Sequence, residues 1–297
     1  MKTYIVCGVM LILGTALPAY PQMGQMGNMG SMRGYNGHEL EQNLVLPQLV
    51  VGDSYSMTIA LVNLGDPDRM GWLTQEQLQT KGKISFYRQD GTRLSVSVNG
   101  GAPVTELRFA LEPARSAYFE LAASGADVSG WALIEIDDDG GETWGRMDDD
   151  AMRRGHRVMA TAFYTLKNAG QALSRVGVTP SLYEMNRYFS SLLAARQDAD
   201  TWTGVAVVNT GATATLVTLR LKDTEGTVLA TASLSLGAGS QTARFIHELF
   251  GGAVPERFQG TLELSTSGEG VVALGLLVSK GILTSIPTFH YGVMSRM

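Results

Sequence analysis

The sequence predicts an all-β fold made of two tandem β-sandwich modules. Short segments rich in Val, Ile, Leu, Thr, Phe and Tyr alternate with Gly, Asp, Asn and Ser clusters at intervals of about ten residues, which is typical of sandwiches and barrels. Helical periodicity is scarce, and the order of strands and turns in the first half of the chain recurs in the second. Two copies of one all-β module account for these observations.

Strands and turns can be assigned in the first half from residue type. Residues 57–63, 84–87 and 131–136 are apolar segments that read as strands. Residues 89–92 and 99–101 contain Gly, Asn and Asp, which tolerate positive φ. We therefore expect tight hairpin turns at these two places.

Five segments of the second half match segments of the first in the same order. Residues 57–63 and 203–209 are apolar strands that end in Val-Asn before a Gly-containing turn, so we expect Asn63 and Asn209 to hold equivalent positions. The other matched pairs are 84–92 with 219–227, 111–116 with 236–240, 130–135 with 260–265, and 158–163 with 271–276. Single matches of this kind are weak, but five in one order indicate a repeated module.

The repeat sets the expected domain organisation, which is 1–19 signal peptide, 20–40 flexible Met/Gly-rich tail, 41–180 first module and 181–297 second module. The first module carries insertions at 66–80 and 137–157, which are expected in loops because the second copy folds without them. Residues 182–195 fit either a short helix or the first strand of the second module.

The N-terminus has the order of a secretory signal peptide. Residues 1–3 include Lys2, residues 4–17 are an apolar run, and Pro18 and Ala19 follow. The run is too short to span a bilayer. We expect cleavage after Ala19, with a site at residues 14–16 as the rival and a retained anchor as the alternative. The protein is then secreted, periplasmic or on the cell surface, with no membrane span in the mature chain.

Cys7 is the single cysteine, and it lies in this apolar run. It would leave with the signal peptide. The mature chain would then have no disulfide, no thiolate nucleophile and no cysteine ligand for a metal.

Composition argues against a nucleic-acid partner. The formal net charge is −5 and the pI is about 5.4, so no concentrated basic face is expected. The tail holds Met23, Met26, Met29 and Met32 among glycines, and thioethers can ligate Cu(I). We favour a flexible tail because no His or Cys anchors the tract.

Ser54 is a candidate nucleophile, because the apolar segment before Gly52-Asp53-Ser54 resembles the nucleophile block of Gly-Asp-Ser hydrolases. Such an enzyme would carry an Asp three residues before its catalytic His. The residues three before His156, His247 and His290 are Arg153, Arg244 and Pro287. The Gly-x-Asn-Asp oxyanion block and the crossover helices of an α/β fold are also missing, so we favour a turn.

The acidic residues in 137–142 and 148–150 could cage Ca²⁺, which prefers oxygen ligands. Their spacing does not fit an EF-hand, so a solvated loop is favoured. The histidines show no i, i+4 pairing and have no Cys partners: His38, His156, His247 and His290. We assign no catalytic, cofactor-binding or metal-binding residue, and we expect no cofactor.

Four aromatic residues could form a platform that stacks on sugars: Tyr55, Trp72, Trp144 and Trp202. Trp131, which lies among Ala, Leu and Ile, reads as a core residue instead. Aromatic residues in sandwich strands more often belong to the core, because their large apolar area holds two sheets together.

Four features together resemble a family of uncharacterised tandem β-sandwich modules from secreted and cell-surface bacterial proteins. They are the Val-Asn strand ends, the Asp/Glu-Gly-Thr turns, residues 244–250 and residues 258–264. The resemblance covers about residues 46–291 and is clearest in the second module. It implies an immunoglobulin-like fold and an extracellular setting, and it supplies no catalytic motif.

The expected function is that of a non-catalytic secreted or cell-surface protein whose sandwiches act as structural, spacer or adhesive modules. Its expected partner is a cell-surface protein or a polysaccharide. The first alternative is a carbohydrate-binding module that uses Trp and Tyr side chains. The second is a serine hydrolase that uses Ser54.

We predict that the exported protein lacks about its first twenty residues, because the N-terminus has the charged, apolar and small-residue order of a signal peptide. N-terminal sequencing of the secreted or periplasmic fraction should find a chain that starts between Leu17 and Met23. A folded cytosolic protein that retains Met1 would contradict this prediction.

Overall fold

The computed structural model describes residues 43–64, 79–137, 158–168, 171–182, 190–280, 282–286 and 288–290. In these ranges the elements are β-strands apart from one short helix, α3 (Ile246–Phe250), and a 3₁₀ turn, η2 (Gly251–Ala253). The all-β class is therefore confirmed. Residues 40–297 form one compact unit, so the division into two separate domains stays a prediction.

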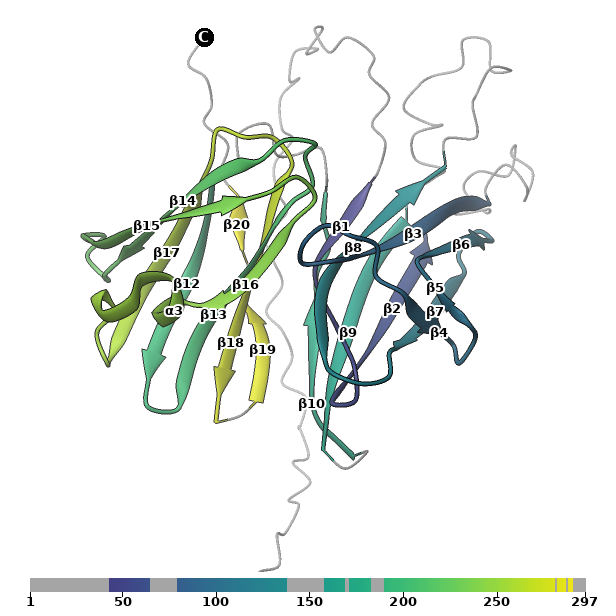
Figure 1. The fold of residues 1–297 in the computed structure, drawn as a ribbon, viewed down its shortest axis with the longest axis horizontal. Coiled ribbons are helices and arrows are strands. Elements are labelled where there is room, and N and C mark those ends of the chain that lie inside the picture. The colour runs from purple at the N-terminus through teal and green to yellow at the C-terminus, as the bar shows by residue number, and fades with distance from the viewer. Residues whose placement is uncertain are drawn as a thin grey trace, which may run out of the picture. The chain divides into compact units, whose positions relative to one another are not determined.

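The N-terminal half of this unit (β1–β11) contains two antiparallel sheets (Figure 1). The five-stranded sheet has the spatial order β11 (Ser181–Leu182), β1 (Leu44–Val51), β8 (Val128–Ile136), β3 (Thr80–Arg88) and β6 (Glu106–Leu111). The six-stranded sheet has the order β10 (Gln171–Val178), β9 (Val158–Asn168), β2 (Tyr55–Asn63), β7 (Ser116–Ala122), β4 (Val96–Val98) and β5 (Pro103–Val104).

The C-terminal half (β12–β20) is one antiparallel sheet that continues through the β12–β13 hairpin. Its order is β15 (Val228–Leu236), β14 (Thr215–Lys222), β17 (Phe258–Ser265), β12 (Ser190–Asp198), β13 (Thr201–Asn209), β18 (Val271–Ser279) and β19 (Ile282–Ile286). Two further strands lie off this path: β16 (Gln241–Phe245) pairs with β13, and β20 (Phe289–His290) pairs with β12.

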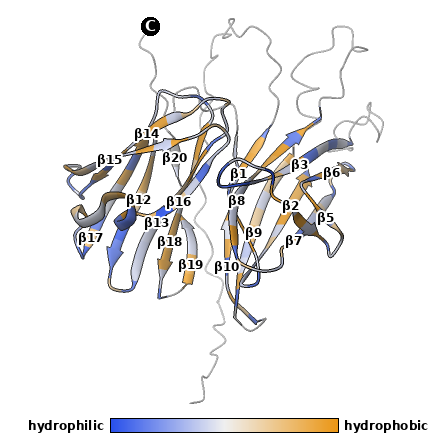
Figure 2. Cartoon of the chain, viewed as in Figure 1, coloured by the Kyte–Doolittle hydropathy of each residue, from blue (hydrophilic) through white to orange (hydrophobic). Residues whose placement is uncertain are grey.

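Each half has its own apolar core, formed by side chains that alternate with polar ones along the strands (Figure 2). The N-terminal core includes residues with no exposed surface, such as Ile59, Leu61, Ile84, Phe86 and Ile134. The C-terminal core includes Val207, Leu219, Leu221, Leu262 and Leu264, which also have no exposed surface. This arrangement is sandwich-like, because side chains of facing strands fill the space between two layers.

The strands expected at 57–63, 84–87 and 131–136 are present as parts of β2, β3 and β8. Of the segment 182–195, residues from Ser190 form strand β12, whereas 183–189 lie outside the described residues. Most of the insertions 66–80 and 137–157 also lies outside them, although Thr80 already belongs to β3.

The two halves share one strand order. The series β11-β1-β8-β3-β6 corresponds to β20-β12-β17-β14-β15, and the series β10-β9-β2-β7 corresponds to β19-β18-β13-β16. Each strand in these series thus has a counterpart at the same place in the other half.

Asn63 and Asn209 hold corresponding positions, as predicted. Asn63 N–H donates to the Arg115 carbonyl at 2.9 Å, and its side-chain amide donates to Leu111 at 3.0 Å. Asn209 N–H donates to the Ser240 carbonyl at 2.8 Å. Its side-chain amide donates to the carbonyl of Thr213 in the β13–β14 loop at 2.8 Å. It also donates to the carbonyls of Gly237 at 2.9 Å and Leu236 at 3.3 Å, at the end of β15. Both asparagines are fully buried, so each satisfies backbone groups that water cannot reach.

The hairpin turns after β3 and β14 also match. In the first turn, Arg88 N–H donates to the Thr92 carbonyl at 2.8 Å. In the second, Asp223 N–H donates to the Thr227 carbonyl at 3.0 Å. Gly91 and Gly226 have φ angles of 84° and 85°, which L side chains rarely adopt. The acidic-Gly-Thr pattern in the sequence therefore marks one turn conformation used twice.

Gly130 in β8 and Gly260 in β17 are a third matched pair. A Cβ atom on Gly130 would lie 2.0 Å from the Tyr87 carbonyl oxygen, and one on Gly260 would lie 2.0 Å from the Lys222 carbonyl oxygen. Both positions require glycine, because the neighbouring backbone approaches too closely for any side chain.

Trp131 is buried, as predicted, but on the outer face of its own sheet. Ala132 and Ile134 belong to the core on the inner side of β8. Because side chains alternate along a strand, Trp131 points to the opposite, outer side. Only 3% of Trp131 is exposed. Its ring stacks on Tyr87, with centroids 4.2 Å apart and planes at 11°.

Residues of the C-terminal half bury this outer face. Trp131 packs in one apolar cluster with Val208 of β13 and Val272 of β18. Its Nε1–H donates to the Gly239 carbonyl at 2.9 Å. The two halves therefore pack sheet face against sheet face around the indole.

Buried amides join the halves beside this cluster. Gln241 Nε2–H donates to Gln48 Oε1 at 2.6 Å and to the Pro47 carbonyl at 3.2 Å. Gln48 Nε2–H donates to Ser129 Oγ at 3.1 Å. The N–H of Gln241 donates to the Gln89 carbonyl at 2.8 Å. These directional bonds fix how the two faces align.

We predict that Asn63→Ala and Asn209→Ala each lower the free energy of unfolding by about 1–3 kcal/mol, because each leaves buried carbonyls without a donor. Chemical denaturation measures the loss. Gln259→Ala, at an exposed position, is the control and should change stability by less than about 0.5 kcal/mol. A loss at only one of the two asparagines would contradict their equivalence.

Candidate functional site

Ser54 lies in the turn between β1 and β2 and bonds through its backbone. Its N–H donates to Asp127 Oδ1 at 2.9 Å, and its carbonyl accepts a bond from Lys167 N–H at 2.8 Å. These are the contacts of a structural turn, which was the favoured interpretation of Ser54.

The residues before Ser54 link this turn to the β7–β8 loop through hydrogen bonds. Asp53 N–H donates to the Gly125 carbonyl at 3.0 Å, and Gly125 N–H donates back to Asp53 Oδ1 at 3.0 Å. A Cβ atom on Gly52 would lie 2.4 Å from Asp127 Oδ1. Gly52, Asp53 and Ser54 thus each have a local structural role that needs no catalysis.

Tyr55 directly follows this turn, and its side chain is half-buried. Burial raises the pKa of its hydroxyl, and the negative charge of Asp127 adds to this effect. Its ring lies edge-on to Tyr164, with centroids 6.3 Å apart. Tyr55 is therefore a neutral, packed side chain at neutral pH.

The described histidines lie in the other half from Ser54. His247 is in α3, where its ring stacks on Phe245 with centroids 5.6 Å apart, and His290 is in β20. His38 and His156 lie outside the described residues.

The acidic segment is described only at Asp137, whose N–H donates to the Lys81 carbonyl at 2.9 Å. The rest of 137–150 lies outside the described residues, as do Met23, Met26, Met29 and Met32. Within the described ranges, no group of three or more His, Cys, Asp or Glu side chains could hold a metal ion. No helix in that same part of the chain is long and apolar enough to cross a membrane.

The proposed aromatic platform is divided between the halves. Tyr55 belongs to β2 and Trp202 to β13, and both side chains are half-buried. Trp72 and Trp144 lie outside the described residues. Tyr55 and Trp202 come from separate halves, and the Tyr55 ring is already engaged by Tyr164.

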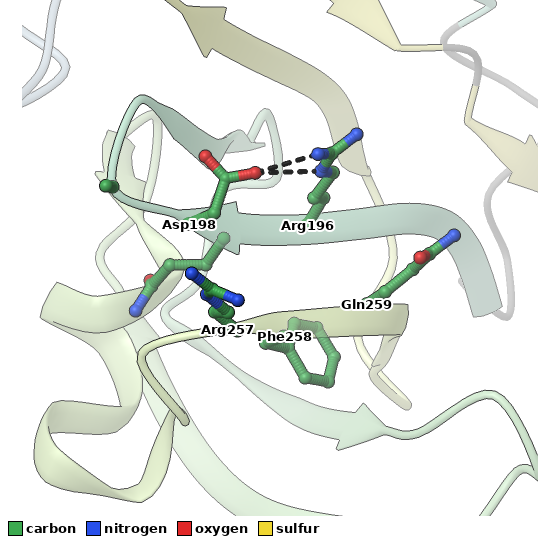
Figure 3. A pocket seen from close by; sticks show the side chains of 7 residues that line it. Arg196, Asp198, Arg257, Phe258 and Gln259 are labelled. Carbon is green, nitrogen blue, oxygen red and sulfur yellow. Dashed lines mark hydrogen bonds and ion pairs between the residues drawn. The ribbon is translucent and has the colours of Figure 1, made fainter.

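An open polar hollow lies where the end of β12 meets the start of β17, and sequence reasoning missed it. It measures about 470 Å³ and is lined by Arg196, Gln197, Asp198, Ala199, Arg257, Phe258 and Gln259 (Figure 3). Arg196 donates to Asp198 Oδ2 from Nη2 at 2.8 Å and from Nε at 3.1 Å. The N–H of Asp200 lowers the pKa of the Asp198 carboxyl, and Arg196 lowers it further.

The hollow contains one ion pair, between Arg196 and Asp198, and a second arginine. Asp198 is engaged by Arg196, whereas Arg257 and Gln259 are exposed. The lining has no Ser, Cys or His side chain to serve as a nucleophile or base. It can offer hydrogen bonds to a polar ligand, but no acid–base pair for catalysis.

Comparisons with known proteins do not assign a family. No family model matches the sequence, and no curated protein matches it. Among solved structures, the chain is similar to a salicylate 1,2-dioxygenase from Pseudaminobacter salicylatoxidans, with 9% identity and a TM-score of 0.21. The match covers 82% of this chain and 74% of that chain. A likeness at this TM-score carries no argument about fold or activity.

We predict that the Gly52-Asp53-Ser54 turn contributes to stability and not to hydrolysis. Gly52→Ala should cost about 1–3 kcal/mol because its Cβ clashes with Asp127. Asp127→Ala should cost about 1 kcal/mol through the lost hydrogen bond to Ser54 N–H. Ser54→Ala keeps that backbone bond and should be nearly neutral. Thermal unfolding measures all three.

A chromogenic ester assay on the same proteins separates the two interpretations of Ser54. Wild type and Ser54→Ala should give the same background rate. Turnover by the wild type that Ser54→Ala abolishes would make Ser54 a nucleophile.

Proposed function

We propose that this chain is a non-catalytic structural or adhesive protein of the cell surface or the exported fraction, built from two β-sandwich modules of one kind. The observation that carries the proposal is the junction at Trp131, which joins the halves through sheet faces. A protein arranged in this way presents two linked modules as one stiff body, which suits a spacer or an adhesive arm.

The chemistry of the junction favours stiffness. Burial of an indole contributes several kcal/mol, and truncating a buried Trp typically costs about 3–5 kcal/mol. The amide bonds of Gln241 to Gln48 and Pro47 add direction, because they form only in one alignment of the faces. A flexible linker between independent modules would show neither feature.

Duplication of one module is part of the proposal. The shared strand order, the paired asparagines Asn63 and Asn209, and the paired glycines Gly130 and Gly260 support it. The immunoglobulin-like family that the sequence resembles consists of such modules.

A binding role without catalysis agrees with the described surfaces. Inward-facing side chains fill both cores, so little interior volume remains to enclose a substrate. The hollow near Arg196 is open and polar. Partners would therefore meet loops and sheet faces, and the insertions 66–80 and 137–157 are the loops specific to the first module.

The expected setting is extracellular, periplasmic or on the cell surface, because residues 1–19 have the pattern of a signal peptide. A cell-surface protein or a polysaccharide is the partner that such a setting offers. A pull-down with polysaccharide distinguishes these two kinds of partner. If the protein is retained on the polysaccharide and Trp202→Ala abolishes that retention, the carbohydrate-binding alternative is favoured.

We predict that Trp131→Ala uncouples the two halves. Small-angle X-ray scattering should show a larger radius of gyration and a broader distance distribution than the wild type. Thermal unfolding should lose single-step cooperativity, because the indole that links the cores is gone. Leu216→Ala, at a side chain that is 57% exposed on β14, is the control and should leave both measurements unchanged. A Trp131→Ala protein with wild-type scattering would contradict the stiff junction.

A further inference from the structure

The hollow between β12 and β17 has a counterpart in the N-terminal half. The matched glycines Gly130 and Gly260 align the strands that meet at these two places, β1 with β12 and β8 with β17. Three residues before each glycine, Arg257 matches Asp127. The β12–β13 hairpin likewise matches the turn that contains Ser54. The two corners of the fold can therefore be compared residue by residue.

Hydrogen bonds from acidic side chains close the corner in the N-terminal half. Asp127 Oδ1 accepts a bond from Ser54 N–H at 2.9 Å, and Asp53 Oδ1 accepts one from Gly125 N–H at 3.0 Å. These bonds hold the β1–β2 turn against the β7–β8 loop. A guanidinium group has no acceptor, so an arginine at the position of Asp127 cannot form this closure.

The matching corner in the C-terminal half is open. Arg257 is exposed, and within the described residues its guanidinium has no ion pair or hydrogen bond. The β12–β13 hairpin bonds to itself instead, since Asp200 N–H donates to Asp198 Oδ1 at 3.0 Å. Gln197 Nε2–H donates to the Pro255 carbonyl at 3.4 Å and ties the loop before Arg257 to β12. The open corner leaves the hollow of about 470 Å³.

The lining of the hollow carries one positive charge in excess, from two arginines and one carboxylate (Figure 3). Asp198 engages the Nε and Nη2 atoms of Arg196, so the Nη1 hydrogens of Arg196 stay available for a ligand. The guanidinium of Arg257 keeps all of its donors. Gln259, the cross-strand neighbour of Arg196, adds an exposed amide that both donates and accepts.

A carboxylate among hydroxyl groups is the ligand chemistry that fits this lining. The planar fork of an arginine binds a carboxylate through two parallel hydrogen bonds. The Gln259 amide and the remaining lone pairs of Asp198 suit hydroxyls, which both donate and accept. A protein segment or a lipid would need apolar surface, whereas the large apolar side chain of the lining, Phe258, is only 6% exposed. A sugar acid combines the two required groups.

Two acidic residues flank the hollow without lining it. Asp200 follows the lining segment of β12, and Glu256 precedes Arg257, and both are exposed. Their negative charges oppose an anionic ligand at long range, and salt screens this repulsion. Binding therefore depends on the direct contact with Arg257 and not on the general field of the surface.

We propose that this hollow binds a uronic acid residue of an acidic polysaccharide, with Arg257 on the carboxylate and Arg196, Asp198 and Gln259 on the hydroxyls. The proposal rests on the binding role proposed above and names the chemistry of its polysaccharide partner. The site belongs to the second module alone, because Asp127 closes the same corner in the first.

Affinity electrophoresis in gels that contain polygalacturonate or alginate tests the proposal, with each mobility compared with that in a polymer-free gel. EDTA is present, so that no divalent cation bridges the carboxylates. At least one of these polymers should retard the wild type, and fully methyl-esterified polygalacturonate should not, because it has the same chain without the charge. Arg257→Ala should weaken the binding about fivefold or more.

Arg115→Ala is the matched control, because it removes the same charge from an exposed side chain of the N-terminal half. It should bind as the wild type does. A wild type that neither polymer retards, or an Arg257→Ala variant with unchanged binding, would overturn the proposal. Equal retardation by polyglutamate would show a carboxylate contact without a sugar site and would also overturn it. Wild-type scattering by Trp131→Ala would instead contradict the stiff junction, so failures of the two proposals are distinguishable.

Discussion

Burial of the Trp131 indole on the outside of its own sheet is the interaction on which the junction of the two halves depends. Outer faces of sandwich sheets normally meet water, so a residue that is 3% exposed there needs a partner surface. Val208 and Val272 supply its apolar part, and the carbonyl of Gly239 satisfies the indole N–H. The turn that holds Gly239 is thereby fixed, and with it the start of β16, where Gln241 reaches Gln48.

Turn chemistry supplies the second constraint, and it is the same in both halves. Gly239 has a φ of 66°, and Ala114 holds the corresponding turn position with a φ of 54°. The N-terminal half carries an alanine at this position, with the local strain of a positive φ and an exposed side chain. In the C-terminal half the same turn presents its carbonyl to Trp131 and approaches Gly91 closely. Gly91 permits this approach, because a Cβ atom there would lie 2.9 Å from the Gly239 carbonyl oxygen. At Gly239 itself, glycine adopts the positive φ without strain.

The sequence predicts the strands, the hairpin turns and the pairing of Asn63 with Asn209, because these depend on local residue type and order. It did not predict that Trp131 faces the other half, because alternation gives the period of a strand and not the surface that covers each face. A signal was present in β13, where 205–208 is a run of apolar residues without alternation. Such a run is typical of a strand buried on both faces. The hollow at Arg196 could not be predicted, because it arises where β12 and β17 meet and their sequences lie far apart.

Strand β2 contains the same kind of run, since 59–62 is Ile-Ala-Leu-Val. Its inward residues, Ile59 and Leu61, have no exposed surface, as expected for a core. Its outward residues, Ala60 and Val62, match Ala206 and Val208 of β13, which the N-terminal half covers. In the described part of the chain this pattern has two outcomes. Val208 of β13 has no exposed surface because the N-terminal half packs on it, whereas Val62 of β2 is partly exposed. An apolar run of this kind therefore predicts a strand that can be buried on both faces, and the packing of the other half decides whether its outer face is covered.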